Sequence, residues 1–200
     1  MPEMEPRQVF KSYEGPVNGS PVRFCAACGS PCADVVAADG RAYRTCTACG
    51  RVHFRNPSPT VSVVVVKDES LLLCLREPQM FRGGMWCLPG GYMEFDEDFL
   101  SAGRREVLEE TGLDVQVKGI LSVHTNFHTP DMSSLSIIML AHPQAGVAEP
   151  RDETQEVRWI GFGEPLPEMA FEHHEYIIQR YIATRYEGAP VDPRFAGLPP

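Results

Sequence analysis

The chain has 200 residues, of which 43% are hydrophobic, enough for one core of ordinary domain size and a small satellite unit. Its net charge of −9 argues against a general nucleic-acid-binding surface, which is normally basic. No apolar run approaches the roughly 18 residues of a membrane-spanning helix, and the N-terminus lacks the apolar stretch of a signal peptide. We therefore expect a soluble, cytoplasmic protein with no membrane association.

The first segment, residues 1–20, mixes proline, glycine and polar residues with few apolar ones. Such a composition cannot bury enough apolar surface to offset the entropy of ordering the chain. We predict a flexible, extended N-terminal segment.

Two Cys-x-x-Cys pairs follow, each with a glycine directly after it, and 17 residues separate Cys28 from Cys46. Each motif can bend round one metal ion, and four thiolates complete a tetrahedral shell that leaves no position for a substrate. Asp39-Gly40, between two short apolar runs, predicts a hairpin between the motifs. We predict a structural zinc ribbon over residues 21–55, in preference to redox chemistry or nucleic-acid contact, with these ligands: Cys25, Cys28, Cys46 and Cys49. Cys32 lies outside both pairs and is interpreted as a packing residue.

The chain then alternates between short apolar runs and turn residues. The segment 51–59 holds two prolines, which exclude a helix and indicate a stiff linker. The predicted strands are 60–67 and 71–76, joined as a hairpin through 67–70, and 85–88, which leads into Pro89-Gly90-Gly91.

A helix is predicted over residues 97–111, with Asp96 as its N-cap and Gly112 ending it. At roughly 100° per residue, three carboxylates fall on one face and Glu97 falls about opposite Glu106. The carboxylate face holds Glu106, Glu109 and Glu110, and the opposite, core face holds Leu100, Val107, Leu108 and Thr111.

The carboxylates at helical spacing allow two interpretations. A run of charges is most often a solvated helix face. Here, however, small residues and a Gly-Gly turn accompany three like charges that repel one another, and a divalent cation would reverse this repulsion. Hard oxygen ligands suit magnesium or manganese better than zinc, so the pattern indicates a magnesium or manganese site.

The second half of the chain is rich in strands. The predicted strands are 113–120, 121–127, 135–141 and 156–160, with a polar loop at 128–131, a closing helix at 171–185 and a flexible tail at 188–200. Strands around one central and one terminal helix indicate an α/β (α+β) domain over residues 56–187, with a mixed sheet between helices.

The central stretch resembles a known family pattern. Gly91, Glu97, Arg105-Glu106-Val107, Glu109-Glu110 and Gly112-Leu113 match the complete Nudix box. The resemblance implies the Nudix α/β/α sandwich and hydrolysis of a nucleoside diphosphate linked to another moiety. It also implies magnesium or manganese ligands at Glu106 and Glu110, with Glu109 as a further ligand or the base. By helical spacing, Arg105 lies one turn before Glu109, which it can orient, and it is a candidate partner of Glu97.

A zinc ribbon directly before such a domain resembles the NADH pyrophosphatase group and its relatives acting on ADP-ribose or FAD. In that group a further acid precedes a Glu-x-x-Glu-x-x-Trp strand, which matches Glu153 to Trp159 here and implies Glu153 as an additional metal ligand. The NADH-specific members carry a tryptophan signature after the box, whereas residues 114–158 contain no tryptophan. The resemblance therefore favours the ADP-ribose and FAD branch.

Substrate contacts are predicted around the glycine turn. Gly90 and Gly91 let the backbone approach a phosphate or metal closely. Arg76 and Arg82 are candidate phosphate contacts or solvated loop residues, and Trp86 is a candidate nucleobase contact or a core residue.

The predicted function is hydrolysis of the pyrophosphate bond in ADP-ribose or FAD, releasing AMP, with a small-molecule nucleotide as partner and a homodimer implied by the family. NAD(H) and NAD-capped RNA are alternative substrates, although the acidic net charge disfavours nucleic acid. A non-catalytic nucleotide-sensing or nucleic-acid-binding module is the alternative of another class.

Overall fold

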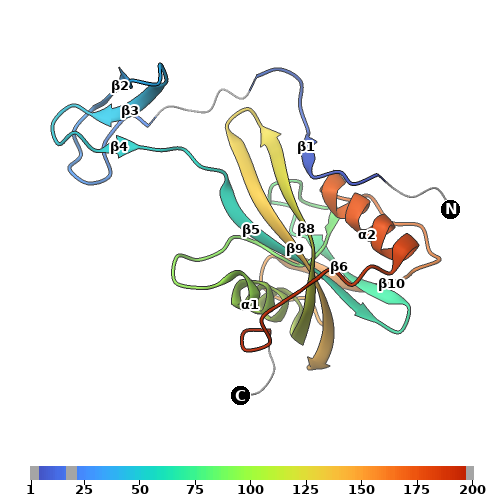
Figure 1. Ribbon diagram of the computed structural model, residues 1–200. Helices are drawn as coiled ribbons and strands as arrows, with labels where there is room; N and C mark the ends of the chain where they lie inside the picture. The colour runs from blue at the N-terminus through green and yellow to red at the C-terminus, as the bar shows by residue number, and fades with distance from the viewer. Residues whose placement is uncertain (1–4, 17–21, 197–200) are drawn as a thin grey trace.

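The computed structural model describes residues 5–16 and 22–196. Within them the chain forms a large body and a small three-stranded unit (Figure 1). The body holds the helices α1 (Phe99–Thr111) and α2 (Glu172–Thr184) and the strands β1 (Val9–Lys11), β5 (Ser58–Lys67), β6 (Ser70–Arg76), β7 (Trp86–Cys87), β8 (Asp114–Thr129), β9 (Met132–Ala145), β10 (Thr154–Gly161) and β11 (Ala189–Pro190). The small unit holds β2 (Cys32–Val36), β3 (Ala42–Cys46) and β4 (Val52–His53).

The body is built on a mixed sheet, in which eight strands lie within the described residues. Its central path has the order β1-β8-β9-β5-β6-β10, with β7 paired to β6 and β11 paired to β8. β5 is parallel to β9 and antiparallel to β6. The predicted hairpin through 67–70 is confirmed, because Lys67 pairs with Ser70 and the two residues between them both have positive φ, as a tight hairpin turn requires.

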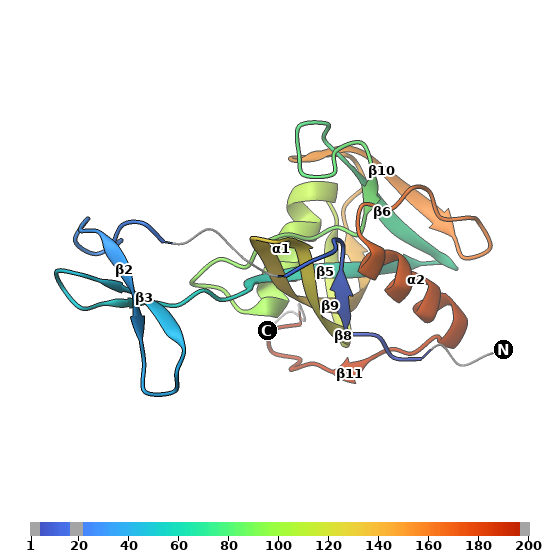
Figure 2. The ribbon, with the colours of Figure 1, turned by 90° about the horizontal axis from the view of Figure 1, so that it is seen from above.

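The helices cover opposite faces of this sheet (Figure 2). Side chains alternate along the β-branched strand β5, so that Val61, Val63 and Val65 pack in the core cluster of α1. Val64 points the other way and packs in the cluster of α2, with Ile177 and Ile178. The predicted α/β/α sandwich is confirmed. No helix in the described ranges is long and apolar enough to cross a membrane.

β8 and β9 form one long hairpin, whereas two separate strands were predicted over 113–127. The register shifts between Val117 and Gly119 and again between Ile120 and Ser122, so bulges bend a single strand instead of ending it. The polar loop predicted at 128–131 shrinks to a tight turn, because Thr129 already pairs with Met132.

The prediction of a flexible segment over residues 1–20 is wrong for its central part. β1 pairs in parallel with β8, and Phe10 is 2% exposed. The ring of Phe10 packs against His124 and Tyr176, which supplies the apolar burial that the composition did not indicate. Residues 1–4 and 17–20 of the predicted segment lie outside the described residues.

The small unit is therefore inserted into the body between β1 and β5 (Figure 1). The predicted domain order, in which this unit precedes the whole body, is wrong in this respect. Its hairpin is confirmed, since Val36 pairs with Ala42 across the turn containing Asp39-Gly40.

The predicted flexible tail is also partly ordered. β11 pairs with Gly119 and Ile120 of β8, and Ala196 is 3% exposed, with its carbonyl accepting a hydrogen bond from Val117 N at 3.0 Å. These backbone hydrogen bonds and the buried alanine hold a proline- and glycine-rich segment that has little apolar content of its own. Residues 197–200 lie outside the described part of the chain.

Candidate active site and candidate zinc site

Helix α1 begins two residues later than predicted. Asp98, not Asp96, is the N-cap: its backbone is extended, and its Oδ1 accepts hydrogen bonds from Leu100 N at 2.9 Å and Ser101 N at 3.0 Å. The predicted end at Gly112 is confirmed, because this residue adopts the left-handed conformation at φ 71°.

The carboxylates of α1 differ strongly in burial. Glu110 is only 5% exposed, whereas Glu109 is exposed and Leu108, predicted for the core face, is 46% exposed. The predicted core face is confirmed at Leu100, Val107 and Thr111, which are buried, but it is wrong at Leu108, and the carboxylate face is not uniformly open because Glu110 is buried. The reason is that the turn containing Gly90 and the sheet cover the side of α1 on which Glu110 lies.

The glycine turn lies close to β5 at Gly90 and close to a side chain of α1 at Gly91. Gly90 has φ 149°, and a Cβ there would lie 2.2 Å from the carbonyl oxygen of Val61. A Cβ on Gly91 would lie 2.6 Å from Oε1 of Glu106. Gly90 N donates a hydrogen bond to Oε2 of Glu110 at 2.9 Å, so the turn positions this carboxylate directly.

Arg105 holds the other carboxylates. Its guanidinium lies 2.6 Å from Glu97 Oε1, 2.9 Å from Glu106 Oε1 and 2.9 Å from Glu109 Oε2. The proposed pairing with Glu97 is therefore present, and the hydrogen bond from Arg105 lowers the pKa of Glu97. The Arg105 guanidinium thus links Glu97, which precedes the helix, to Glu106 and Glu109 in its second half.

The electrostatics of the buried carboxylates favour a bound cation. Burial raises the pKa of Glu110 to about 8, despite the hydrogen bond from Gly90, and burial also raises the pKa of Glu106. A divalent ion beside these oxygens would favour their charged forms. Carboxylate oxygens suit magnesium or manganese, so the donor chemistry fits such an ion, but no three of these carboxylates offer oxygens within 4.8 Å of one another in the described residues.

A cavity of about 210 Å³ opens beside the glycine turn. Of the residues predicted for the site, Gly90, Gly91, Arg76 and Glu153 line it. Its other lining residues are Thr60, Val61, Ser62, Met80, Phe81, Cys87, Leu88, Tyr92, His128, Met132, Ser134, Ser136, Phe171, His173 and His174.

Two predicted substrate contacts do not line this cavity. The Arg82 guanidinium donates to the carbonyl oxygen of Ala170 and lies over the ring of Phe171, 5.7 Å from its centroid. Trp86 packs against the core cluster beneath α2, in agreement with its alternative interpretation as a core residue.

Sequence reasoning missed the polar residues beneath the cavity. Thr60 and Ser136 share a hydrogen bond of 2.6 Å, and Asn126 donates to Ser136 at 2.9 Å. Neither ring nitrogen of His124 has a hydrogen-bond partner. Period-two alternation offered a signal, because polar residues recur at 60 and 62, 124 and 126, and 134 and 136 within otherwise apolar strands.

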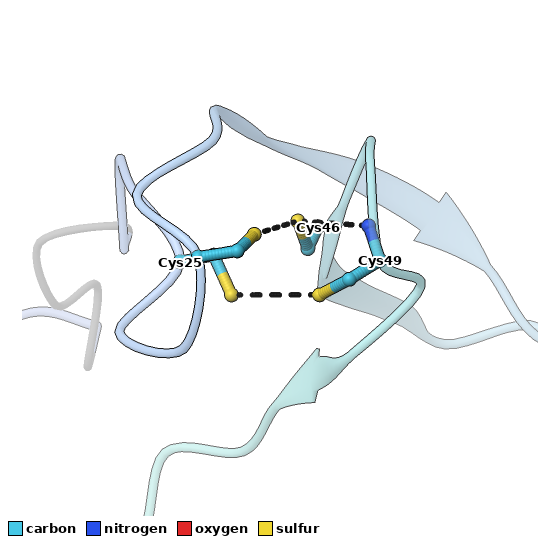
Figure 3. A group of neighbouring side chains, drawn as sticks. Cys25, Cys46 and Cys49 are labelled. Atoms are coloured by element: carbon cyan, nitrogen blue, oxygen red, sulfur yellow. Dashed lines mark hydrogen bonds between the residues drawn. The ribbon is translucent and has the colours of Figure 1, made fainter.

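The four cysteines of the small unit converge on one point (Figure 3). The Sγ atoms of Cys25 and Cys49 lie 3.8 Å apart, and those of Cys28 and Cys46 lie 3.5 Å apart. Among the described residues, only these four form a group of three or more potential metal ligands within 4.8 Å of one another. Cys32 packs against Cys25 and Cys46 outside the group, in line with its predicted packing role.

The chemistry of this cluster suits a zinc ion. Hydrogen bonds from the backbone of Cys49 and Ala48 lower the pKa of Cys46 to about 6, and a backbone hydrogen bond from Ser30 lowers that of Cys28. Thiolates are the form that binds metal, and four of them satisfy a tetrahedral ion. The cluster could therefore bind zinc as a closed structural site.

The model of the NUDIX domain family matches residues 56–181, and the chain belongs to this family. It is 31% identical over 166 residues to the NAD-capped RNA hydrolase NudC of Stutzerimonas stutzeri, covering 82% of this chain and 57% of that protein. It is 32% identical over 130 residues to the ADP-ribose pyrophosphatase of Methanocaldococcus jannaschii, covering 64% of this chain and 75% of that protein.

Among solved structures, a NUDIX hydrolase from Nitrosomonas europaea superposes with a TM-score of 0.74 at 26% identity, covering 85% of this chain and 96% of that one. The family and fold predicted from the box are confirmed. The chain spans little more than half the length of the NudC relatives it matches.

Proposed function

We propose that this protein is a metal-dependent pyrophosphohydrolase acting on a nucleoside diphosphate derivative. The observation that carries the proposal is the buried Glu110, which accepts a hydrogen bond from Gly90, and Gly90 lines a cavity together with Arg76 and Glu153. A solvated acidic helix face would not bury a carboxylate whose pKa is about 8. The same burial argues against a retired site in a non-catalytic module.

The carboxylates have distinct proposed roles. Glu106, Glu110 and Glu153 would hold magnesium or manganese, which neutralises phosphate oxygens and lowers the pKa of bound water. Glu109 is exposed, with its side chain 48% accessible, so it is the carboxylate best placed to bind a further ion or accept a proton from water. Arg105 orients Glu106 and Glu109 from within the helix.

The cavity suits the nucleoside part of the substrate. Phe81, Phe171 and Tyr92 offer aromatic surface to a base, while Thr60 and Ser136 offer hydroxyls. Arg76 lies at the same cavity and could meet a phosphate, although its Nε also donates to the Phe81 carbonyl.

We favour ADP-ribose or FAD as substrate, with AMP as a product. The similarity to an ADP-ribose pyrophosphatase supports this choice. NAD(H) or NAD-capped RNA is the second candidate, favoured by the similarity to NudC proteins over 82% of the chain. We also propose that the four-cysteine site binds zinc in a structural role. The cysteines are unpaired by disulfides, which supports the proposal of a cytoplasmic location. We propose, in addition, that the protein is a homodimer.

A substrate panel tests the proposal. ADP-ribose, FAD, NADH, NAD and a dinucleoside polyphosphate would be incubated with magnesium or manganese, and the products identified by chromatography. Faster release of AMP from ADP-ribose or FAD than from NADH would support the favoured substrates. Fastest cleavage of NADH or NAD would move the assignment to the second candidate, and no turnover of any compound would contradict the hydrolase proposal.

A further inference from the structure

His174 lies near the start of α2, on the opposite face of the sheet from α1, and is 3% exposed. Its Nδ1 accepts a hydrogen bond from Leu88 N at 3.1 Å, and its Nε2 lies 3.0 Å from Ser62 Oγ. Because Nδ1 accepts a hydrogen bond from a backbone amide, the ring proton is assigned to Nε2, which donates to Ser62. Both ring nitrogens are therefore used, in one tautomer.

Leu88 needs such a partner because of its place in the chain. β7 ends at Cys87, and Leu88 is 1% exposed, so its amide has neither a strand partner nor water. The next residue, Pro89, has no N–H, and the next amide along the chain is that of Gly90. The two successive amides thus go to His174 on one side and to Glu110 on the other.

The remaining contacts of the turn are made through its carbonyls. Pro89 O accepts from Val63 N and Gly91 O accepts from Val61 N, both at 2.9 Å. These bonds hold the turn against β5, but neither involves the Leu88 N–H. Its acceptor is His174 Nδ1. The Gly90 N–H belongs to the same planar peptide group as the Pro89 carbonyl, so the bond from Val63 N helps to set its direction, and His174 fixes the peptide at Leu88, where the turn begins.

We propose that His174 is a positioning residue for the active site: by accepting the Leu88 amide it fixes the glycine turn whose next amide holds Glu110. The inference rests on the proposed function, because Glu110 is taken as a metal ligand. It links the start of α2 to the carboxylates of α1 through the turn between them.

Two uncharged substitutions test the two hydrogen bonds of His174 one at a time, the bond from Leu88 and the bond to Ser62. In His174→Asn the amide oxygen takes the place of Nδ1 and can accept from Leu88, while in His174→Gln the amide group reaches the place of Nε2 and leaves Leu88 without a partner. We expect His174→Asn to retain most of kcat. We expect His174→Gln to lose about tenfold or more in kcat, with KM changed by less than about threefold, and to need more metal for half-maximal rate.

A control separates positioning from simple destabilisation. Ile178→Ala removes a buried side chain one turn further along the same helix and lowers stability without removing the ring that accepts the Leu88 amide. If kcat and the metal requirement of Ile178→Ala match those of His174→Gln at equal melting temperature, or if the Asn and Gln variants lose kcat equally, the proposal is overturned.

A measurement on the unaltered protein keeps the test independent of activity and of variant folding. Nuclear magnetic resonance should detect ¹⁵N–¹⁵N coupling across the hydrogen bond from Leu88 N to His174 Nδ1, and the Leu88 and Gly90 amides should exchange slowly. Absence of the coupling, or fast exchange at Leu88, would overturn the inference even in an active enzyme. If the coupling is present but no nucleotide is hydrolysed, the positioning stands and the proposed function fails.

Discussion

The two candidate metal sites of this protein are built in opposite ways. The four cysteines come from one small unit, and their sulfurs already lie within 4.8 Å of one another. The carboxylates, in contrast, occupy α1 and the residue before β10, and protein groups hold them: Arg105 binds Glu106 and Glu109, and Gly90 binds Glu110. A closed site can form locally, whereas a site that must admit substrate depends on long-range packing.

The largest expected effect concerns the carboxylates. Glu106→Gln keeps the shape of the side chain but removes its charge, so kcat should fall by at least roughly 100-fold, as on loss of a key electrostatic group. Steady-state kinetics with metal present would measure this. The matched control is Glu156→Gln, an exposed position on β10, which should keep its activity. Near-normal turnover in Glu106→Gln would remove this residue from the site.

Substitution in the glycine turn should have the next largest effect, on stability and on activity. Gly90→Ala puts a Cβ 2.2 Å from Val61 O in a conformation that L-residues rarely adopt, so the free energy of unfolding should fall by about 2–3 kcal/mol or more, with loss of activity. Gly163→Ala is the control, because no atom lies within 4 Å of its Cβ. Urea unfolding would measure the free energy of unfolding of both variants. Equal values for Gly90→Ala and Gly163→Ala would contradict the close approach of Gly90 to Val61.

The histidines of the body should make it sensitive to acid. Burial lowers the pKa of His174 to about 3 and that of His124 to about 4, below the ordinary value of 6.5. Below pH 6.5 the unfolded chain gains protons at these histidines that the folded protein cannot, so their contribution to stability is complete above this pH and decreases as pH falls toward 4. The slope should be of order 1 kcal/mol per pH unit per histidine. Unfolding curves from pH 7 to 4.5 would show a smaller slope for His124→Gln, and an unchanged slope would contradict this account.

The smallest expected effect on hydrolysis comes from the four-cysteine site. Cys46→Ser removes one zinc ligand and should release zinc and unfold the small unit, as closed zinc sites supply folding energy. The body has its own core, so kcat should stay within about threefold. Zinc content, circular dichroism and the substrate assay would be measured together. A large loss of kcat would show that the two sites are coupled.

Local spacing explains what the sequence predicted well. The box on α1, the cysteine pairs and the hairpin at Asp39-Gly40 each lie within a short stretch, and the structure forms the helix, the cluster and the turn. The roles assigned to the individual carboxylates stay predictions. Both Asp96 and Asp98 satisfy the capping preference, and only the observed hydrogen bonds of Asp98 decide between them.

The features that were missed depend on distant partners. β1 has one buried apolar residue, Phe10, in a polar segment, and its order comes from pairing with β8 more than 100 residues away. The burial of Glu110 arises from the approach of Gly90, and the role of His174 from its contact with Leu88. None of these follows from periodicity or from local preference.

The insertion of the small unit between β1 and β5 has a consequence for how the chain can be altered. Both strands border the β8–β9 hairpin near its tip, so about three strand spacings, roughly 14 Å, separate their ends. About five extended residues would bridge that gap, far fewer than residues 12–57 provide. Shortening this connection fivefold should lower its closure cost by only about 1.4 kcal/mol. We therefore expect that a short linker can replace the small unit without breaking the sheet.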